Sequence, residues 1–180
     1  MARHPLLIQR WHMNTDKDKF IKLVRHPIKF RIFLFSKLPS AFFSGVRVKH
    51  IDTGAAIVTV PYKWFSQNPF KSTYFACLAM AAEMSTGLLG MLHTYKNSPA
   101  ISMLVVGIEG RYFKKATGLT TFTCEDGEII NNIIQDALKS GEGRSVKARS
   151  VGRNEQQETV AEFFVTWSFK ARRENGLTVV

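Results

Sequence analysis

Hydrophobic positions along this chain follow two different periods, and the changes between them divide it into helices and strands. The first part is rich in Phe, Ile, Leu, Lys and Arg, and the steps His26-Pro27 and Leu38-Pro39 interrupt it. Because a residue before proline disfavours helical geometry, we expect two separate helices, at 17–25 and 28–37. Beyond residue 45 the pattern becomes strand-like. Runs at 46–51 and 55–60 flank the turn sequence Asp52-Thr53-Gly54, which predicts a hairpin.

The central segment, residues 72–95, is apolar or small at nearly every position. Asn68-Pro69 is a favourable helix start, and Ser72 is a second candidate N-cap. A helix that is apolar all round lies in a protein core or in a membrane. Glu83 stands at its middle, and a carboxylate there would cost roughly 2.5–3.5 kcal/mol on membrane-insertion scales. We therefore expect a core helix.

After Pro99 the pattern alternates with period two. Both faces of 101–108 are apolar, so this strand is expected at the centre of a sheet. Further runs predict a strand at 117–124, a helix at 128–139 and a final hairpin of 145–153 with 159–169. Since the strands are joined mainly as hairpins, the class is α+β with a mostly antiparallel sheet.

Composition indicates one globular domain, because 45% of the 180 residues are hydrophobic and 22% are charged. The formal net charge of +11 favours anionic partners: nucleic acid, an anionic membrane, or a phosphate-bearing molecule such as coenzyme A. No run of five basic residues, RNP-like stretch or helix-turn-helix pattern occurs, so nucleic acid is not expected.

The two cysteines, Cys77 and Cys124, have no spacing suited to zinc. We expect reduced thiols, no metal, no secretory signal and a cytoplasmic location.

Glu83 is the most informative candidate for chemistry, since it is the one charged side chain between Lys71 and Lys96. A carboxylate on an apolar helix is costly unless it is paired. It can serve as a general base or a nucleophile, with a pKa raised by burial. The alternative is a structural ion pair, with Arg111 or with a Lys across a dimer interface. Asn68 can orient a carbonyl or a water, or can simply cap the helix.

The stretch PYKWFSQNPFKSTYFACLAMAAEMSTG, residues 61–87, resembles hotdog-fold thioesterases of the phenylacetyl-CoA and 4-hydroxybenzoyl-CoA type. These carry an Asn or Gln before the central helix and an acidic residue on it, the places of Asn68 and Glu83. The Phe-rich basic N-terminal helices and the GVRVKHI opening, residues 45–51, are also similar to the uncharacterised DUF4442 group.

The resemblance implies a curved antiparallel sheet around one long central helix. It divides the chain into an N-terminal helical extension (1–44), a hotdog domain (45–172) and a tail (173–180). It also implies a homodimer or a dimer of dimers, joined strand edge to strand edge, with no cofactor beyond coenzyme A in the substrate. Glu83 and Asn68 would be catalytic, and the substrate contacts would be Ser72, Thr73, Phe75, Ala76, Thr86 and Arg111.

The expected activity is acyl-CoA hydrolysis. The family usually has glycine where the central helix begins, and this chain has Tyr74, Phe75 and Ala76. That difference favours a second hypothesis, a protein that binds an acyl or fatty ligand without turning it over. A third hypothesis is peripheral contact with a membrane through the basic, Phe-rich segment 28–37.

Overall fold

A single six-stranded antiparallel sheet organises the protein, as seen in a computed structural model that describes residues 15–172. The strand order is β1-β2-β4-β5-β6-β3. The bounds are β1 Arg47–Ile51, β2 Ala56–Val60, β3 Ile101–Tyr112, β4 Thr120–Cys124, β5 Arg144–Arg153 and β6 Thr159–Ala171. The hairpins β1–β2 and β5–β6, together with the antiparallel pair β3–β6 between distant segments, account for most of the ladder.

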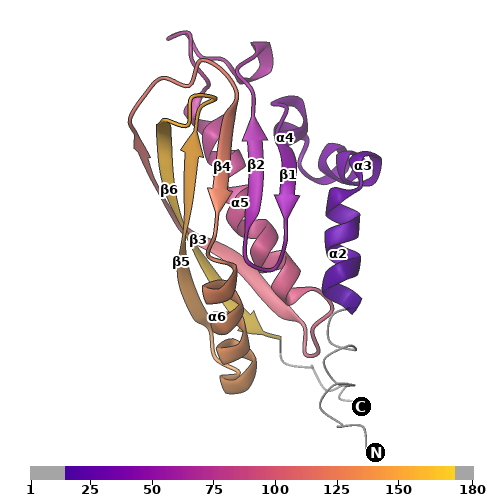
Figure 1. Ribbon diagram of the computed structural model, residues 1–180. Coiled ribbons are helices and arrows are strands. Elements are labelled where there is room, and N and C mark those ends of the chain that lie inside the picture. The colour runs from indigo at the N-terminus through magenta and orange to yellow at the C-terminus, as the bar shows by residue number, and fades with distance from the viewer. Residues whose placement is uncertain (1–14, 173–180) are drawn as a thin grey trace, which may run out of the picture.

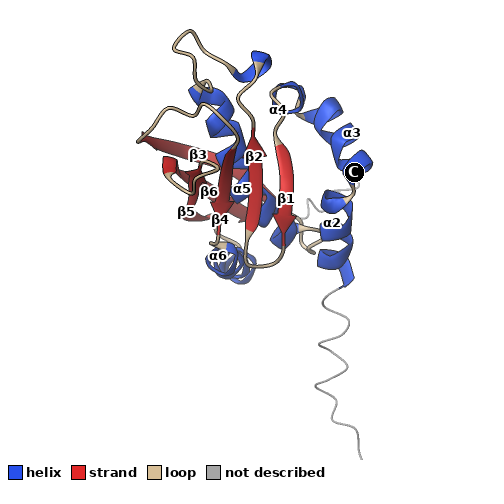
Figure 2. Cartoon of the chain, turned by 45° about the horizontal axis from the view of Figure 1, so that its top comes forward, coloured by secondary structure: helices blue, strands red, loops and turns tan. Residues whose placement is uncertain are grey.

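The long helix α5, Phe75–Thr94, lies against the inner face of this sheet (Figures 1 and 2). It contacts every strand. It is also the one helix among residues 15–172 that is long and apolar enough to cross a membrane, and 67% of its most apolar window is buried. The interior position accounts for its composition, as the sequence predicts for a core helix.

Three helices precede the sheet: α2 Thr15–Arg25, α3 Pro27–Lys37 and α4 Pro39–Phe43. Figure 1 places them beside the edge strand β1, where α2 packs on β1 and both α2 and α4 reach α5. His26 caps α3, since its Nδ1 accepts from the N–H groups of Ile28 and Lys29. Pro27 and Pro39 each open a helix, because proline lacks the N–H that the first turn leaves unused.

The remaining helix, α6 Gly127–Ser140, packs on β5 and β6 and touches α5. Its buried face carries Ile130 and Ile134, in agreement with the helical spacing in the sequence. Gly141 ends it in the left-handed conformation (φ 71°), where glycine carries no steric penalty. The α+β class and the arrangement of sheet and central helix are thus confirmed.

The expectation that residues 101–108 form a central strand is wrong. β3 is an edge strand that pairs with β6 alone. A register irregularity between Val105 and Gly107 also breaks the simple alternation of faces. A strand that is apolar on both faces looks central in sequence, but here part of that apolar surface remains exposed.

The expected start of the central helix is also wrong. Asn68 and Ser72 precede the helix, which begins at Phe75 with Tyr74 in the N-cap position. Residues 64–66 form a 3-10 turn, η1 Trp64–Ser66, and the chain then bridges Gln67 to Thr73 before the helix starts. Tertiary hydrogen bonds to this loop therefore outweigh the local capping preference of Asn-Pro.

Candidate functional site

Glu83 lies midway along α5 and lines a cavity of about 310 Å³. We call this the Glu83 cavity. Its walls are apolar apart from the carboxylate itself, and they come from α3, α5, β3 and β6. The lining residues are Phe30, Phe33, Leu38, Glu83, Met84, Gly87, Leu88, Met91, Met103 and Trp167.

The surroundings of Glu83 destabilise its charged form. Burial raises the pKa of Glu83 above its ordinary value of 4.5. Across residues 15–172, no basic side chain forms an ion pair with it and its carboxylate accepts no hydrogen bond. The alternative pairing with Arg111 is not realised, because Arg111 pairs with Glu162 (4.0 Å). A carboxylate with a raised pKa in an apolar cavity is suited to take up a proton.

The floor of the Glu83 cavity is held by a short chain of hydrogen bonds. The indole Nε1–H of Trp167 donates to the Thr86 hydroxyl (2.9 Å), which donates to the Glu83 main-chain carbonyl (2.9 Å). Thr86 therefore positions the helix and Trp167, and its hydroxyl does not contact the Glu83 carboxylate. At Gly87, an added Cβ would lie 3.0 Å from the Trp167 ring and 3.3 Å from Glu83 Oε1. Glycine there leaves room beside the carboxylate.

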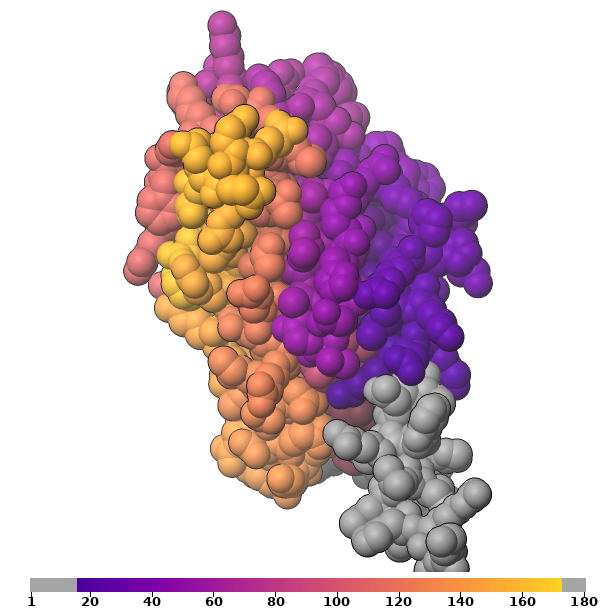
Figure 3. Space-filling view, in the orientation of Figure 1, coloured from indigo at the N-terminus to yellow at the C-terminus, as the bar shows by residue number. Residues whose placement is uncertain are grey.

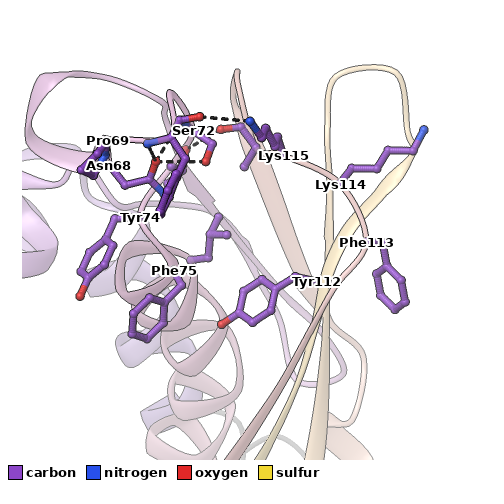
Figure 4. Close-up of a pocket in the computed structure, with 13 residues that line it drawn as sticks. Asn68, Pro69, Ser72, Tyr74, Phe75, Tyr112, Phe113, Lys114 and Lys115 are labelled. Atoms are coloured by element: carbon purple, nitrogen blue, oxygen red, sulfur yellow. Dashed lines mark hydrogen bonds between the residues drawn. The ribbon is translucent and has the colours of Figure 1, made fainter.

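A second and larger cavity, about 600 Å³, lies at the N-terminus of α5 (Figure 4). We call it the helix-start cavity. Figure 4 shows Tyr74 and Phe75 at the beginning of the helix, with Tyr112 of β3 pointing toward them. Its lining residues are Asn68, Pro69, Phe70, Ser72, Thr73, Tyr74, Phe75, Leu78, Tyr112, Phe113, Lys114, Lys115 and Ala116.

The first turn of α5 presents free donors to this cavity. Tyr74 makes no side-chain capping bond. No hydrogen bond in the described part of the chain uses the N–H of Phe75 or Ala76. The positive end of a helix dipole and unused N–H groups favour an anion or a developing negative charge.

Asn68, Ser72 and Thr73 build the loop that leads into the helix. Asn68 Oδ1 accepts from the N–H of Phe70 (2.9 Å) and from the N–H and hydroxyl of Ser72 (3.3 Å each). The Thr73 hydroxyl donates to the Ala116 carbonyl (3.1 Å). The side-chain oxygen of Asn68 is thereby used within the loop.

The structure separates the two residues that the sequence pairs as catalytic. Asn68 lies at the helix-start cavity and Glu83 at the other. Phe75 and Glu83 stand eight residues apart on one helix, which corresponds to about 12 Å along its axis. Ser72, Thr73 and Phe75 line the helix-start cavity together with Asn68, and Ala76 follows in the same first turn. Arg111 lines neither cavity.

Sequence reasoning missed the residues that enclose Glu83 from other elements, above all Trp167, Met103 and Phe33. The alternation of β6 marks Trp167 as inward-facing. No local signal indicates that it meets the helix turn that carries Glu83. Two basic residues, Lys114 and Lys115, also line the helix-start cavity. Lys114 pairs there with Glu158.

Comparison with known proteins identifies the fold of this chain. No known protein-family model matches the chain, and no curated protein matches it by sequence. Solved structures do. One is a Pseudomonas aeruginosa protein of unknown function described as a probable thioesterase: 22% identity, TM-score 0.65, covering 86% of this chain and 95% of that one. Another is a protein of unknown function from Chlorobaculum tepidum. It has 18% identity and a TM-score of 0.68, covering 80% of this chain and 93% of that one.

A thioesterase from Haemophilus influenzae is similar over 82% of this chain and 92% of its own, with 10% identity and a TM-score of 0.58. At such identities the likeness concerns the fold. The chain therefore has the hotdog fold, and its structural neighbours include thioesterases.

Proposed function

We propose that this protein hydrolyses acyl thioesters such as acyl-CoA, with Glu83 as the general base or the nucleophile. The observation that supports this proposal is the unpaired Glu83 carboxylate, with its raised pKa, in an apolar cavity beside the central helix. As a base, Glu83 takes a proton from water while the water oxygen bonds to the thioester carbonyl carbon. The carbon–sulfur bond then breaks, and the thiolate leaves and acquires the proton.

The N–H groups of Phe75 and Ala76 would hold the oxyanion that forms on the carbonyl oxygen. Asn68 would orient the carbonyl through its amide nitrogen, since its oxygen is engaged in the loop. Within one protomer these donors lie about 12 Å along the helix from Glu83. A complete site therefore requires a second protomer, whose helix start would approach Glu83.

The edge strand β3 is the proposed contact between protomers, in a homodimer or a dimer of dimers. It pairs on one side only, and Leu104, Val106 and Ile108 are all half exposed or more, with Leu104 at 64%. An unpaired apolar edge is a ready template for another strand. Pairing through β3 would extend the sheet across two copies. Membership of the DUF4442 group and a cytoplasmic location belong to the same proposal, based on the sequence.

One observation favours the alternative, a non-catalytic acyl- or lipid-binding protein. Tyr74 and Phe75 are bulky and partly exposed at the helix start, where close approach of a thioester is easier over glycine. In that case the two cavities would hold a fatty ligand, and Glu83 would be a ligand contact.

The test is thioester hydrolysis on a panel of short, medium, long and aromatic acyl-CoAs, followed by release of free thiol. Native protein should turn over at least one class, and Glu83→Ala should lose that activity while remaining folded and of unchanged oligomeric state. Asn68→Ala serves as the second variant. Binding of acyl-CoA without turnover by the native protein would establish the alternative.

A further inference from the structure

The solvent side of α3 is apolar, although its other side is already packed into the protein. Phe30 and Leu34 are buried. On the opposite side Ile28 and Ile32 are 65% and 62% exposed, and Phe35 is also exposed. These three follow the i, i+4, i+7 spacing of one helical face. A helix that is apolar on both sides needs a second apolar environment beyond the protein core.

The exposed surface continues from α3 onto α4 and η1. Phe35 packs against Phe42 and Phe43, Phe43 stacks on Phe65 at 5.4 Å, and Phe65 packs against Trp64. Trp64 is 77% exposed. In Figure 3, α3 lies at the right-hand margin of the molecule. We call this surface the α3–η1 face: Ile28, Ile32, Phe35, Phe43, Trp64 and Phe65.

The charge around this face has one sign. Residues 19–82 contain ten basic side chains and one acidic, Asp52, whereas residues 83–180 contain twelve basic and eleven acidic. Asp52 pairs with His50 at the far end of the β1–β2 hairpin. Lys29 and Lys37 are exposed on α3, and Lys63 precedes Trp64. Nearly all of the net positive charge thus belongs to the segment that carries the exposed aromatic residues.

We propose that the α3–η1 face docks on an anionic lipid bilayer, with its aromatic and aliphatic side chains in the interface and its lysines at the headgroups. Exposed Trp and Phe next to Lys is the composition of interfacial membrane anchors. A protein partner with an acidic surface would satisfy the lysines, but it would leave the continuous apolar ridge exposed or would need a matching groove. A bilayer surface satisfies both.

Docking also gives the Glu83 cavity an entrance for lipid. Phe33 and Leu38 line that cavity, are themselves partly exposed, and lie on or next to α3. With α3 in the interface, the cavity mouth lies beside the acyl chains. This consequence rests on the proposed function and assigns long-chain, membrane-partitioned acyl thioesters as the substrate class.

Sedimentation with phosphatidylcholine vesicles, with and without phosphatidylserine, tests docking on the full chain. Native protein should sediment with the anionic vesicles at low salt and much less at high salt. Ile32→Ser with Phe35→Ser should weaken binding at least about tenfold, since apolar insertion is lost. Lys29→Glu with Lys37→Glu should weaken it by about thirtyfold or more and reduce the salt dependence.

The matched controls lie on α6, where Ile129 and Lys139 are likewise exposed. Ile129→Ser and Lys139→Glu should bind as the native protein does. Insertion of Trp64 should shift the tryptophan fluorescence of the native protein to the blue when vesicles are added. Trp64→Phe should lack this shift. Thermal unfolding of every variant confirms that each one folds.

Failure of the native protein to sediment with anionic vesicles, or equal sedimentation of Ile32→Ser/Phe35→Ser and native protein, overturns the proposal. Self-association that disappears in Ile32→Ser/Phe35→Ser, without vesicle binding, would assign the face to a second copy. Vesicle binding is measured without any substrate, so its outcome is independent of hydrolysis. The preference for long-chain acyl thioesters is measured separately, by comparing hydrolysis of the acyl-CoA panel with and without vesicles.

Discussion

The two faces of the sheet differ in how they accommodate carboxylates. On the outer face, Glu109 pairs with Lys147, and Glu162 pairs with Arg149 and Arg111. On the inner face, Glu83 lies in an apolar cavity, has no ion-pair partner among residues 15–172, and has a raised pKa. The outer face stabilises ionised groups in solvent, whereas the inner face leaves Glu83 able to exchange a proton. This difference indicates where chemistry can occur.

The largest expected effect tests the packing of the two faces. Trp167 is nearly buried on the inner side of β6, while Phe164 lies partly exposed on its outer side. Trp167→Ala should cost about 3–5 kcal/mol in the free energy of unfolding, because it empties the cavity floor and removes the bond to Thr86. Phe164→Ala should cost less than half as much. Urea denaturation measures both, and equal costs would contradict the assignment of faces.

The pH dependence of hydrolysis tests the state of Glu83. Because burial raises its pKa, the active ionised form appears only above the ordinary range of a glutamate. The rate should fall about tenfold per pH unit below that raised pKa. Glu83→Gln should lack this limb and be slower by about a hundredfold or more.

Glu109→Gln, on the outer face, is the matched control for this profile and should reproduce the native one. A native rate that is flat with pH down to the ordinary pKa of a glutamate would show that Glu83 is not the titrating base.

A smaller effect is expected in the pH dependence of folding stability, where Asp52 and Glu83 should differ. Hydrogen bonds from His50, Ala55 and Gly54 lower the pKa of Asp52 from 3.8 to about 2. Its ionised form therefore stabilises the folded state above pH 3.8, and this contribution disappears as pH falls through about 2. Asp52 is half exposed, so Asp52→Asn should cost about 1 kcal/mol or less.

The stability contribution of Glu83 changes with pH in the opposite direction, because its folded-state pKa is raised. Its stabilising contribution is present at low pH and is lost as pH rises above 4.5 through the raised value. Glu83→Gln should thus gain stability relative to native protein as pH increases. Thermal unfolding from acid to neutral pH follows both variants, and parallel curves for the two would contradict this difference in sign.

The smallest effect is expected for an outer-face ion pair. Lys147→Ala removes the partner of Glu109, and both side chains are exposed. Solvent and salt screen such pairs, so the free energy of unfolding should change by less than about 1 kcal/mol. A larger loss in urea denaturation would mean that the outer face is more tightly coupled to the core than its exposure indicates.

Apart from the short helix α4 and the start of α5, the sequence alone determined the helices and strands and the interior position of α5, because periodicity and proline placement are local properties. It also identified Glu83 as an unusual charge, since one carboxylate in an apolar helix is visible without coordinates. Only tertiary structure decided that β3 is an edge strand. Strand order depends on pairing between distant segments. Apolar side chains on both faces therefore do not distinguish a central strand from an edge strand.

Tertiary structure likewise decided the start of α5. Asn68 and Ser72 have the chemistry of N-caps, but hydrogen bonds from Thr73 to Ala116 and from Tyr74 to Ser66 hold residues 67–73 in a turn that precedes the helix. The sequence already marked segment 28–37 as basic and Phe-rich, but a helix with apolar residues on two sides does not reveal which side faces the core. That choice depends on contacts with α2 and α4, which α3's own sequence pattern does not contain.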